Sequence, residues 1–203
     1  MVSRREQERA RRRAERERQL AERQHAEDVV FEAMTGKKAP VRDPNQLTDP
    51  NVVRNQIVTA YGRGRRGGPD TAAAARDLGV SRRTVQRWLS GGTGVSPQHR
   101  QGLQRAARRA AETKTGRRRA LGEEPRRGGK NMKVKGFQGP TEAGVTYSRN
   151  RTVTRQLDAD QVDELRLAFA EDGYDGARGW INGNMEEYLE GWRIERLDDL
   201  DIE

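Results

Sequence analysis

The stretch from Thr71 to Gly92, T-A-A-A-A-R-D-L-G-V-S-R-R-T-V-Q-R-W-L-S-G-G, constrains the fold of this chain most. Its small residues predict a short helix that ends near Leu78. Gly79 then stands where the chain must turn with positive φ, which glycine does at no steric cost. Ser81 is placed to cap a second helix that runs through Leu89, because its hydroxyl can accept from the free amides of the first turn. We expect a helix-turn-helix.

The second helix has two unlike faces. Its apolar face, Val85 and Trp88, turns inward. The outward face carries the candidate DNA contacts Ser81, Arg82, Arg83, Gln86 and Arg87. In a helix-turn-helix this face enters the major groove, where Arg and Gln can make paired hydrogen bonds to guanine and adenine edges. The alternative is an ordinary helical hairpin with a solvated basic face, but the coincidence of turn glycine, capping serine and outward arginines favours DNA binding.

Charge is distributed unevenly along the chain. Residues 51–155 carry 24 basic and 6 acidic side chains, whereas residues 156–203 carry 4 basic and 15 acidic ones. A basic block around a helix-turn-helix is typical of a protein that binds the phosphate backbone. Arginine enrichment also follows from a GC-rich coding sequence, and the sequence does not separate the two causes. The glycine-rich loop at 62–70 adds arginines that can reach phosphates.

Several classes of protein are excluded or disfavoured by composition. The chain has no cysteine, which excludes disulfides, zinc fingers and thiol catalysis and suits a reducing cytoplasm. No apolar run approaches the length of a membrane span, so we expect no membrane partner and a cytoplasmic, nucleoid-associated protein. His25 and His99 are far apart in charged contexts, so we expect no metal site. The sequence shows no catalytic constellation, so we expect no cofactor and no enzymatic activity.

The predicted fold class is mainly α with a small α+β C-terminal module. Hydrophobic content of 32% and charged content of 35% indicate small folded modules separated by solvated segments. The expected order is a long charged helix over 1–34, a linker over 35–50, a helix-turn-helix domain of about four helices over 51–112, a basic linker over 113–131, and the α+β module with an acidic C-terminus over 132–203. For the charged helix, a solvated or partly disordered state is favoured over a partner-binding one.

Further arginines extend the expected DNA-binding surface beyond the helix-turn-helix. A helix from Ser96-Pro97 to about Ala111 has alanines and a leucine inward and arginines outward. The outward candidates are Arg105, Arg108 and Arg109 on this helix, followed by Arg117, Arg118 and Arg119 in the basic linker.

The C-terminal module changes character from Met132 onward. Alternation at 132–135 and β-forming residues at 145–155 predict two short strands, with a turn at 136–140 between them. A helix is expected over 158–170, then a loop at 173–183, a short helix at 184–189, a strand starting at Trp192, and an acidic tail.

This order of parts resembles the terminal proteins of actinobacterial linear replicons, also called telomere terminal proteins. The resemblance rests on G-V-S-R-R-T-V-Q-R at 79–87, the Arg-rich stretch at 97–119, the Phe- and Thr-containing segment at 136–157, the helical stretch at 160–169 and the acidic end at 185–203. It covers roughly residues 50–203 and implies a DNA-binding protein of linear chromosomes or plasmids. It also implies partnership with a DNA polymerase and a telomere-associated protein.

In that family a side-chain hydroxyl primes DNA replication and becomes covalently linked to the 5′ end. The resemblance points to Thr146, with Tyr147, Ser148 and Thr141 as rivals, although the acidic pair that the family has beside its threonine is absent here. The alternative is that Thr146 and Ser148 are plain outward-facing residues of a strand. The competing hypothesis is a transcription regulator or plasmid maintenance protein in which residues 132–203 form a dimerisation module, giving a homodimer.

Overall fold

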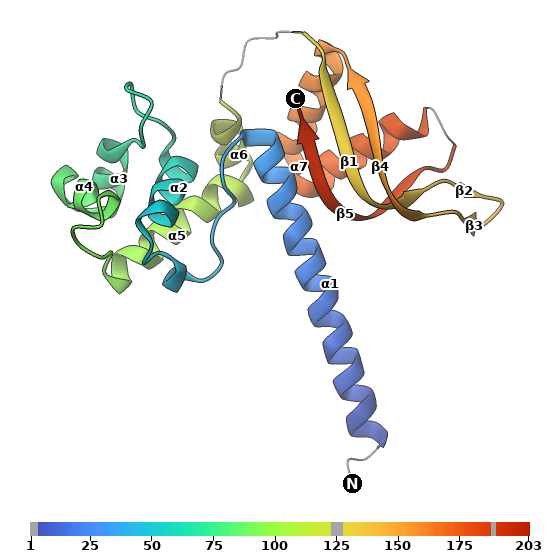
Figure 1. The fold of residues 1–203 in the computed structure, drawn as a ribbon, viewed down its shortest axis with the longest axis horizontal. Coiled ribbons are helices and arrows are strands. Elements are labelled where there is room, and N and C mark those ends of the chain that lie inside the picture. Colours follow the sequence, from blue (N-terminus) through green and yellow to red (C-terminus); the bar gives the residue numbers. More distant parts are fainter. Residues whose placement is uncertain (1–3, 123–127, 188–189) are drawn as a thin grey trace.

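The computed structural model describes residues 4–122, 128–187 and 190–203, and shows a mainly helical chain with a small C-terminal antiparallel sheet (Figure 1). The helices are α1 (Arg4–Thr35), η1 (Pro44–Gln46), α2 (Pro50–Tyr61), α3 (Thr71–Leu78), α4 (Arg82–Leu89), α5 (Pro97–Glu112), α6 (Lys114–Leu121) and α7 (Ala159–Glu186). The strands are β1 (Lys130–Gly139), β2 (Thr141–Glu142), β3 (Val145–Thr146), β4 (Arg149–Leu157) and β5 (Arg193–Ile202).

Helices α2 to α5 surround one apolar core, and we call them the helical unit. Ile57, Val85 and Leu103 are completely buried in it, and Trp88 is 3% exposed. The bounds of α3, α4 and α5 agree closely with those expected from glycine, serine and proline positions. Local sequence signals suffice to predict these bounds, because helix caps and turns depend on the residues at those positions.

The segment 35–50 was expected to be a linker, but the structure packs it onto the helical unit. Leu47 is fully buried in the core of that unit. The Gln56 side chain accepts from the Val41 amide at 3.0 Å and donates to the Ala39 carbonyl at 2.9 Å. Gln56 therefore provides hydrogen-bond partners for backbone groups that no helix or strand satisfies in this stretch. Turn residues in the sequence do not reveal such a tertiary contact.

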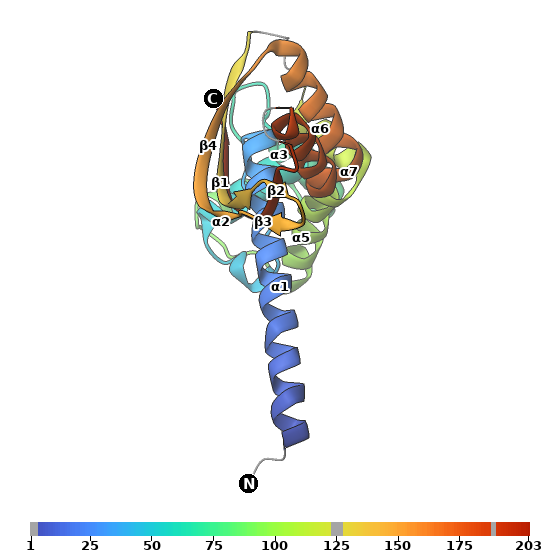
Figure 2. The same ribbon diagram turned by 90° about the vertical axis from the view of Figure 1, so that its right-hand side faces the viewer.

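Helix α1 is formed as expected, but only its first half is solvated. Residues 4–23 are exposed, whereas Ala26, Val30, Phe31 and Met34 are buried against the C-terminal module. The ring of Phe31 lies 6.3 Å from that of Phe169. In Figures 1 and 2 the solvated half projects well beyond the rest of the molecule. The view of 1–34 as a separate charged helix is therefore corrected, since its last turns complete the core around the sheet.

The expected basic linker at 113–131 contains a packed helix, α6, over residues 114–121. Thr113 caps it, with its hydroxyl accepting from the Gly116 amide at 3.0 Å. A side chain at Gly116 would collide with the backbone of Arg109 and Ala110, so the glycine permits α6 to lie directly against α5. Residues 123–127 of the expected linker lie outside the described residues.

The sheet has the strand order β4-β1-β5, with every pair antiparallel. Helices α1 and α7 cover one face of it, as Figure 2 shows. The turn expected at 136–140 is absent, because β1 continues through Gly136, where a Cβ would meet the backbone of Arg196 and Leu197 on β5. The chain turns instead at Ala143 and Gly144, both with positive φ, which closes the β2–β3 hairpin.

The C-terminal third differs from expectation in two further ways. The loop expected at 173–183 is helical, since α7 continues past a kink at Gly173 (φ 62°, ψ −133°). The acidic tail is the strand β5, with Leu197 and Leu200 buried and Asp199 and Asp201 exposed on the opposite face. Two of the residues expected in a short helix, Tyr188 and Leu189, lie outside the described residues. Within the described chain, no helix is both long enough and apolar enough to cross a membrane.

Candidate nucleic-acid interface

Local hydrogen bonds fix the turn between α3 and α4. Asp70 caps α3 by accepting from the amides of Ala72 and Ala73. Gly79 has φ 67°, in the left-handed region, and the next amide, Val80, returns to the Ala75 carbonyl at 3.0 Å. Ser81 then accepts from the Thr84 amide at 3.0 Å. These are the functions that the sequence predicted for the glycine and the serine, and they set the direction of α4.

Helix α4 places its predicted contact residues on one exposed face. Val85 and Trp88 are buried, the latter with its ring 5.4 Å from that of His99. The opposite face is exposed and carries all five residues predicted on it, namely Ser81, Arg82, Arg83, Gln86 and Arg87. The Arg82 side chain already makes one hydrogen bond within the protein, since its Nε donates to the Thr71 hydroxyl at 3.0 Å. Among the described residues, no carboxylate forms an ion pair with Arg83 or Arg87.

Two arginines of α5, Arg108 and Arg109, are less available than Arg83 and Arg87 of α4. Arg108 pairs with Glu112 at 2.6 Å, and Arg109 lies 3.5 Å from Asp77. Asp77 also accepts the hydroxyl of Tyr61 at 2.7 Å. Burial, reinforced by this hydrogen bond, raises the pKa of Tyr61. Arg105 is exposed, and no described carboxylate pairs with it.

The three consecutive arginines of α6 have different environments. Arg117 is 7% exposed, and its guanidinium donates to the carbonyls of Ala170, Glu171, Ala111 and Glu112. Burial lowers its pKa. Arg118 is exposed and pairs with Glu171 at 2.6 Å, and Arg119 is exposed. Arg117 was predicted to contact DNA, and this prediction is corrected, because its side chain ties α6 to α7 inside the molecule.

The loop between α2 and α3 is compact. Arg63 and Pro69 form an isolated β-bridge, and the Gly64 amide donates to the Gly68 carbonyl at 2.7 Å. Arg65 and Arg66 are exposed at its end. Sequence reasoning recognised the arginines but not the bridge, because no residue in the loop favours a strand.

The four candidate priming hydroxyls lie at or beside the β2–β3 hairpin, which projects from the far end of the sheet from the helical unit (Figure 1). Thr146 is exposed and Tyr147 is 54% exposed. Thr141 is half-buried, with its hydroxyl oxygen 3.5 Å from that of Thr146. The Ser148 hydroxyl is buried, with no hydrogen-bond partner among the described atoms. Thr146 and Tyr147 are therefore the two exposed residues among the four candidates.

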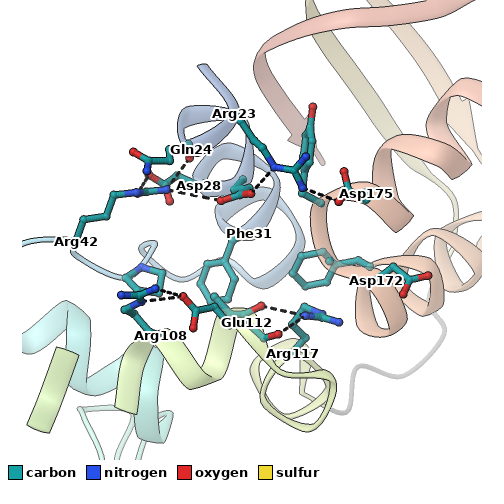
Figure 3. Close-up of a pocket in the computed structure, with 16 residues that line it drawn as sticks. Arg23, Gln24, Asp28, Phe31, Arg42, Arg108, Glu112, Arg117, Asp172 and Asp175 are labelled. Atoms are coloured by element: carbon teal, nitrogen blue, oxygen red, sulfur yellow. Dashed lines mark hydrogen bonds and ion pairs between the residues drawn. The ribbon is translucent and has the colours of Figure 1, made fainter. Parts of the chain in front are cut away.

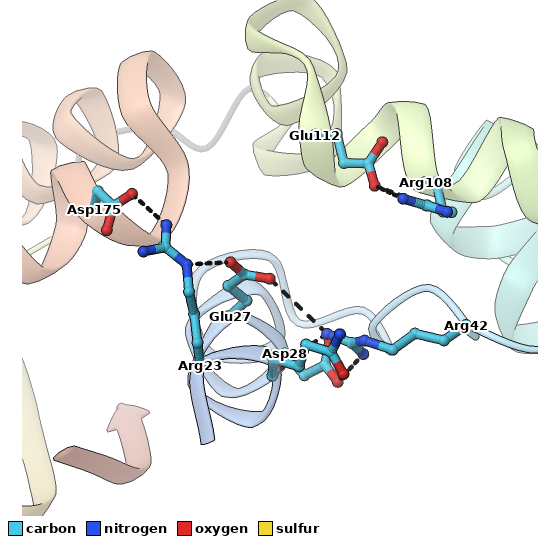
Figure 4. Close-up of polar contacts among 8 residues, drawn as sticks. Arg23, Glu27, Asp28, Arg42, Arg108, Glu112 and Asp175 are labelled. Carbon is cyan, nitrogen blue, oxygen red and sulfur yellow. Dashed lines mark hydrogen bonds and ion pairs between the residues drawn. The ribbon is translucent and has the colours of Figure 1, made fainter. Parts of the chain in front are cut away.

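A polar cavity of about 470 Å³ lies where α1, α5, α6 and α7 meet (Figure 3). Each arginine that lines it is engaged with carboxylates or backbone carbonyls of the chain. Arg23 bonds both Asp175, at 2.6 Å, and Glu27, at 3.0 Å. Arg42, which follows α1 in the chain, bonds Asp28 at 2.5 Å (Figure 4). Arg23 thus joins α1 to α7, and Arg42 joins the segment 35–50 to α1.

No group of three or more potential metal ligands is found among the described residues. Comparison of the chain with protein-family models, curated proteins and solved structures gave no match to any of them.

Proposed function

We propose that this protein binds duplex DNA through α4, which acts as the recognition helix of a helix-turn-helix formed with α3. The observation that carries the proposal is the exposed face of α4. It presents Arg83, Gln86 and Arg87, whereas Val85 and Trp88 are buried on the opposite face. A short amphipathic helix fixed by its caps, with free arginines outward, suits insertion into the major groove.

The distribution of ion pairs supports the same face. Several arginines elsewhere on the chain, such as Arg23, Arg42 and Arg108, are paired with carboxylates of the protein, although no described carboxylate pairs with Arg105. Arg83 and Arg87 have no such partner in the described part of the chain, so DNA can bind them without first breaking an internal ion pair. Because an ion pair of the free protein must be given up on binding, unpaired arginines favour a contact with an external anion.

The test is selection of a duplex site from a random library, followed by binding of Arg83→Ala and Arg87→Ala to the selected sequence. Loss of a bidentate base contact should cost about 1–3 kcal/mol and relax sequence preference at one position. Arg108→Ala is the matched control, because its side chain is exposed on the same unit but paired with Glu112. If both α4 variants bind as the wild type does, the assignment of α4 is wrong.

We further propose that the protein serves as a terminal protein, with Thr146 as its priming hydroxyl and Tyr147 as the rival. In this reaction the hydroxyl oxygen attacks the α-phosphorus of a deoxynucleoside triphosphate. A phosphoester forms, pyrophosphate leaves, and the hydroxyl proton passes to solvent. The polymerase supplies the metal ions and positions the nucleotide. The observation that favours this role is the placement of two exposed hydroxyls on a projecting hairpin, where the active site of another protein can reach them.

The priming role is tested by incubation with the polymerase of the same replicon and labelled nucleotide. Label should remain on the protein after denaturation, and should be lost in Thr146→Val or in Tyr147→Phe. Ser148→Ala is the control, since its hydroxyl is buried and the variant should still be labelled. Absence of label on the wild type would leave DNA binding alone and favour the regulator hypothesis, which predicts an inverted repeat and no adduct.

A further inference from the structure

The two outer strands of the sheet differ in how their free edges are protected. Strand β5 pairs with β1 through two register shifts, and His25 of α1 bonds the Asp198 carbonyl at 2.9 Å. Strand β4 pairs with β1 over nine residues without a shift and has no second neighbour among the described strands. It contains no proline and no bulge. A long regular edge of this kind is a template for pairing with another strand.

The register identifies which backbone groups of β4 face outward. Asn131 and Glu203 exchange two hydrogen bonds, so Asn131 points its amide and carbonyl toward β5. The next residue, Met132, must then point its groups toward β4, where it is opposite Arg155. It follows by alternation that Arg151, Val153 and Arg155 bond to β1. The groups that point to the free edge belong to Asn150, Thr152, Thr154 and Gln156.

The sequence of this edge is palindromic. Residues 151–155 read R-T-V-T-R, which is the same in both directions around Val153. In an antiparallel pairing of two copies centred on Val153, Thr152 lies opposite Thr154 of the second copy, and Asn150 lies opposite Gln156. All four are residues whose amides and carbonyls face outward, so these pairs are the hydrogen-bonded ones. The opposed side chains are neutral and can hydrogen-bond each other.

We propose that two copies of this protein associate along β4, with a two-fold axis at Val153, into a six-stranded sheet. The two Val153 residues form a non-hydrogen-bonded pair on the helix-covered face. There each half-buried side chain gains an apolar neighbour. The same register sets Arg151 opposite Arg155 of the second copy, which is a like-charge pair. Each of these arginines is engaged within its own copy, since Arg151 lies 5.2 Å over the Trp192 ring and Arg155 bonds Glu187 at 3.3 Å. The same two-fold axis relates the two helical units of such a dimer.

The absence of native cysteine allows a single-residue test of the register. Opposed residues of a non-hydrogen-bonded pair have Cα atoms about 4.5 Å apart, within the range that a disulfide spans. Val153→Cys should therefore cross-link into a covalent dimer under mild oxidation. Thr152→Cys is the matched control, since residue 152 of the second copy lies diagonally at about 7–8 Å and should not cross-link. Cross-linking at 152 in place of 153 would overturn this register.

Charged substitutions at Thr152 and Thr154 test the interface without a covalent cross-link. Both side chains are exposed, so the fold of one copy tolerates the change. Thr152→Lys with Thr154→Lys sets like charges opposite each other twice and should raise the dimer dissociation constant by about tenfold. Thr152→Lys with Thr154→Glu sets opposite charges together and should restore association. Sedimentation velocity over a dilution series measures both.

Association is measured without DNA, so its failure is separate from failure of the proposed function. A wild-type chain that remains monomeric at every concentration overturns the proposal. A dimer unaffected by either charge pair overturns it as well, because the contact must then lie elsewhere. Retention of the monomer fold in each variant is checked by its circular dichroism spectrum.

Discussion

At the scale of single residues, Arg117 shows how far a side chain's function depends on its neighbours. It is the first of three consecutive arginines, and nothing in the sequence separates it from Arg118 or Arg119. The helix directs Arg117 inward to four backbone carbonyls, two at the C-terminal end of α5 and two within α7. A guanidinium suits this position because it offers five donors in one plane. Its two neighbours stay exposed.

Arg117→Ala should therefore destabilise the fold strongly. The change leaves four carbonyl oxygens without this donor and opens space beside Gly173. We expect the free energy of unfolding to fall by about 3 kcal/mol, since hydrogen bonds to charged groups and unsatisfied buried acceptors each cost about 1–3 kcal/mol. Urea denaturation followed by circular dichroism measures this. Arg118→Ala, which removes only a surface pair with Glu171, should change stability by less than about 1 kcal/mol.

At the scale of elements, α1 combines two different segments in one helix. In its first turns, exposed ion pairs form between residues four positions apart, such as Arg12 with Glu8 and Arg13 with Glu17. Its last turns carry the apolar residues that reach the core around the sheet. The solvated half contributes helix length, and the buried half contributes tertiary stability.

The two halves should respond differently to truncation of a large apolar side chain. Phe31 is 3% exposed and packs against Phe169, so Phe31→Ala should cost about 3–5 kcal/mol. Leu20, on the same helix, is 56% exposed, and Leu20→Ala should change the free energy of unfolding by less than about 0.5 kcal/mol. Equal effects at the two positions would contradict the division of α1 that the structure shows.

The sequence predicted the elements that local chemistry determines. Gly79 indicates the end of α3, Ser81 the start of α4 and Pro97 the start of α5. The bounds of these three helices were predicted correctly from them. What the sequence did not reveal depends on distant residues. The packing of 35–50 requires Gln56, α6 requires contact between Gly116 and α5, and β5 requires β1 as its partner. An acidic stretch with spaced leucines resembles a solvated tail until a neighbouring strand accepts its hydrogen bonds.

For the candidate site too, the sequence predicted what depends on local residues and did not predict what depends on contacts with distant ones. Every residue expected on the outward face of α4 is exposed there, because helical spacing alone decides which face a residue occupies. The arginines outside α4 were predicted from charge alone, and charge does not show whether a carboxylate or a carbonyl of the same chain already binds the side chain. Arg108 and Arg117 are two such residues.

At the scale of the whole molecule, part of the unevenly distributed charge is paired inside the protein. Acidic residues of the C-terminal third meet basic residues from earlier elements. Asp175 binds Arg23 of α1, Glu187 binds Arg155 of β4, and Glu171 binds both Lys114 and Arg118 of α6. These pairs join α1 and α6 to α7. The net charge of the basic block therefore overstates what remains for a nucleic acid, and the unpaired arginines of α4 matter more than the total.

Glu171 makes this internal use of charge testable by pH. Its hydrogen bonds to Lys114 and then to Arg118 hold the pKa of its carboxyl below the ordinary value, which is about 4.3. The unfolded chain therefore binds a proton at this group more readily than the folded chain does. The stabilisation is present above the ordinary pKa and is lost as pH falls through the lower folded value. The wild type should lose stability on acidification from about pH 5 to pH 3.

Glu171→Gln removes the titrating group and should flatten this part of the profile, whereas stability near neutral pH should be slightly lower because the charged pairs are lost. The measurement is urea denaturation at each pH, with the free energy of unfolding plotted against pH for the two proteins. Glu142→Gln is the control, since Glu142 is exposed at the β2–β3 hairpin and forms no ion pair with the described residues. A variant at Glu171 as acid-sensitive as the wild type would show that the link between α6 and α7 does not depend on this carboxylate.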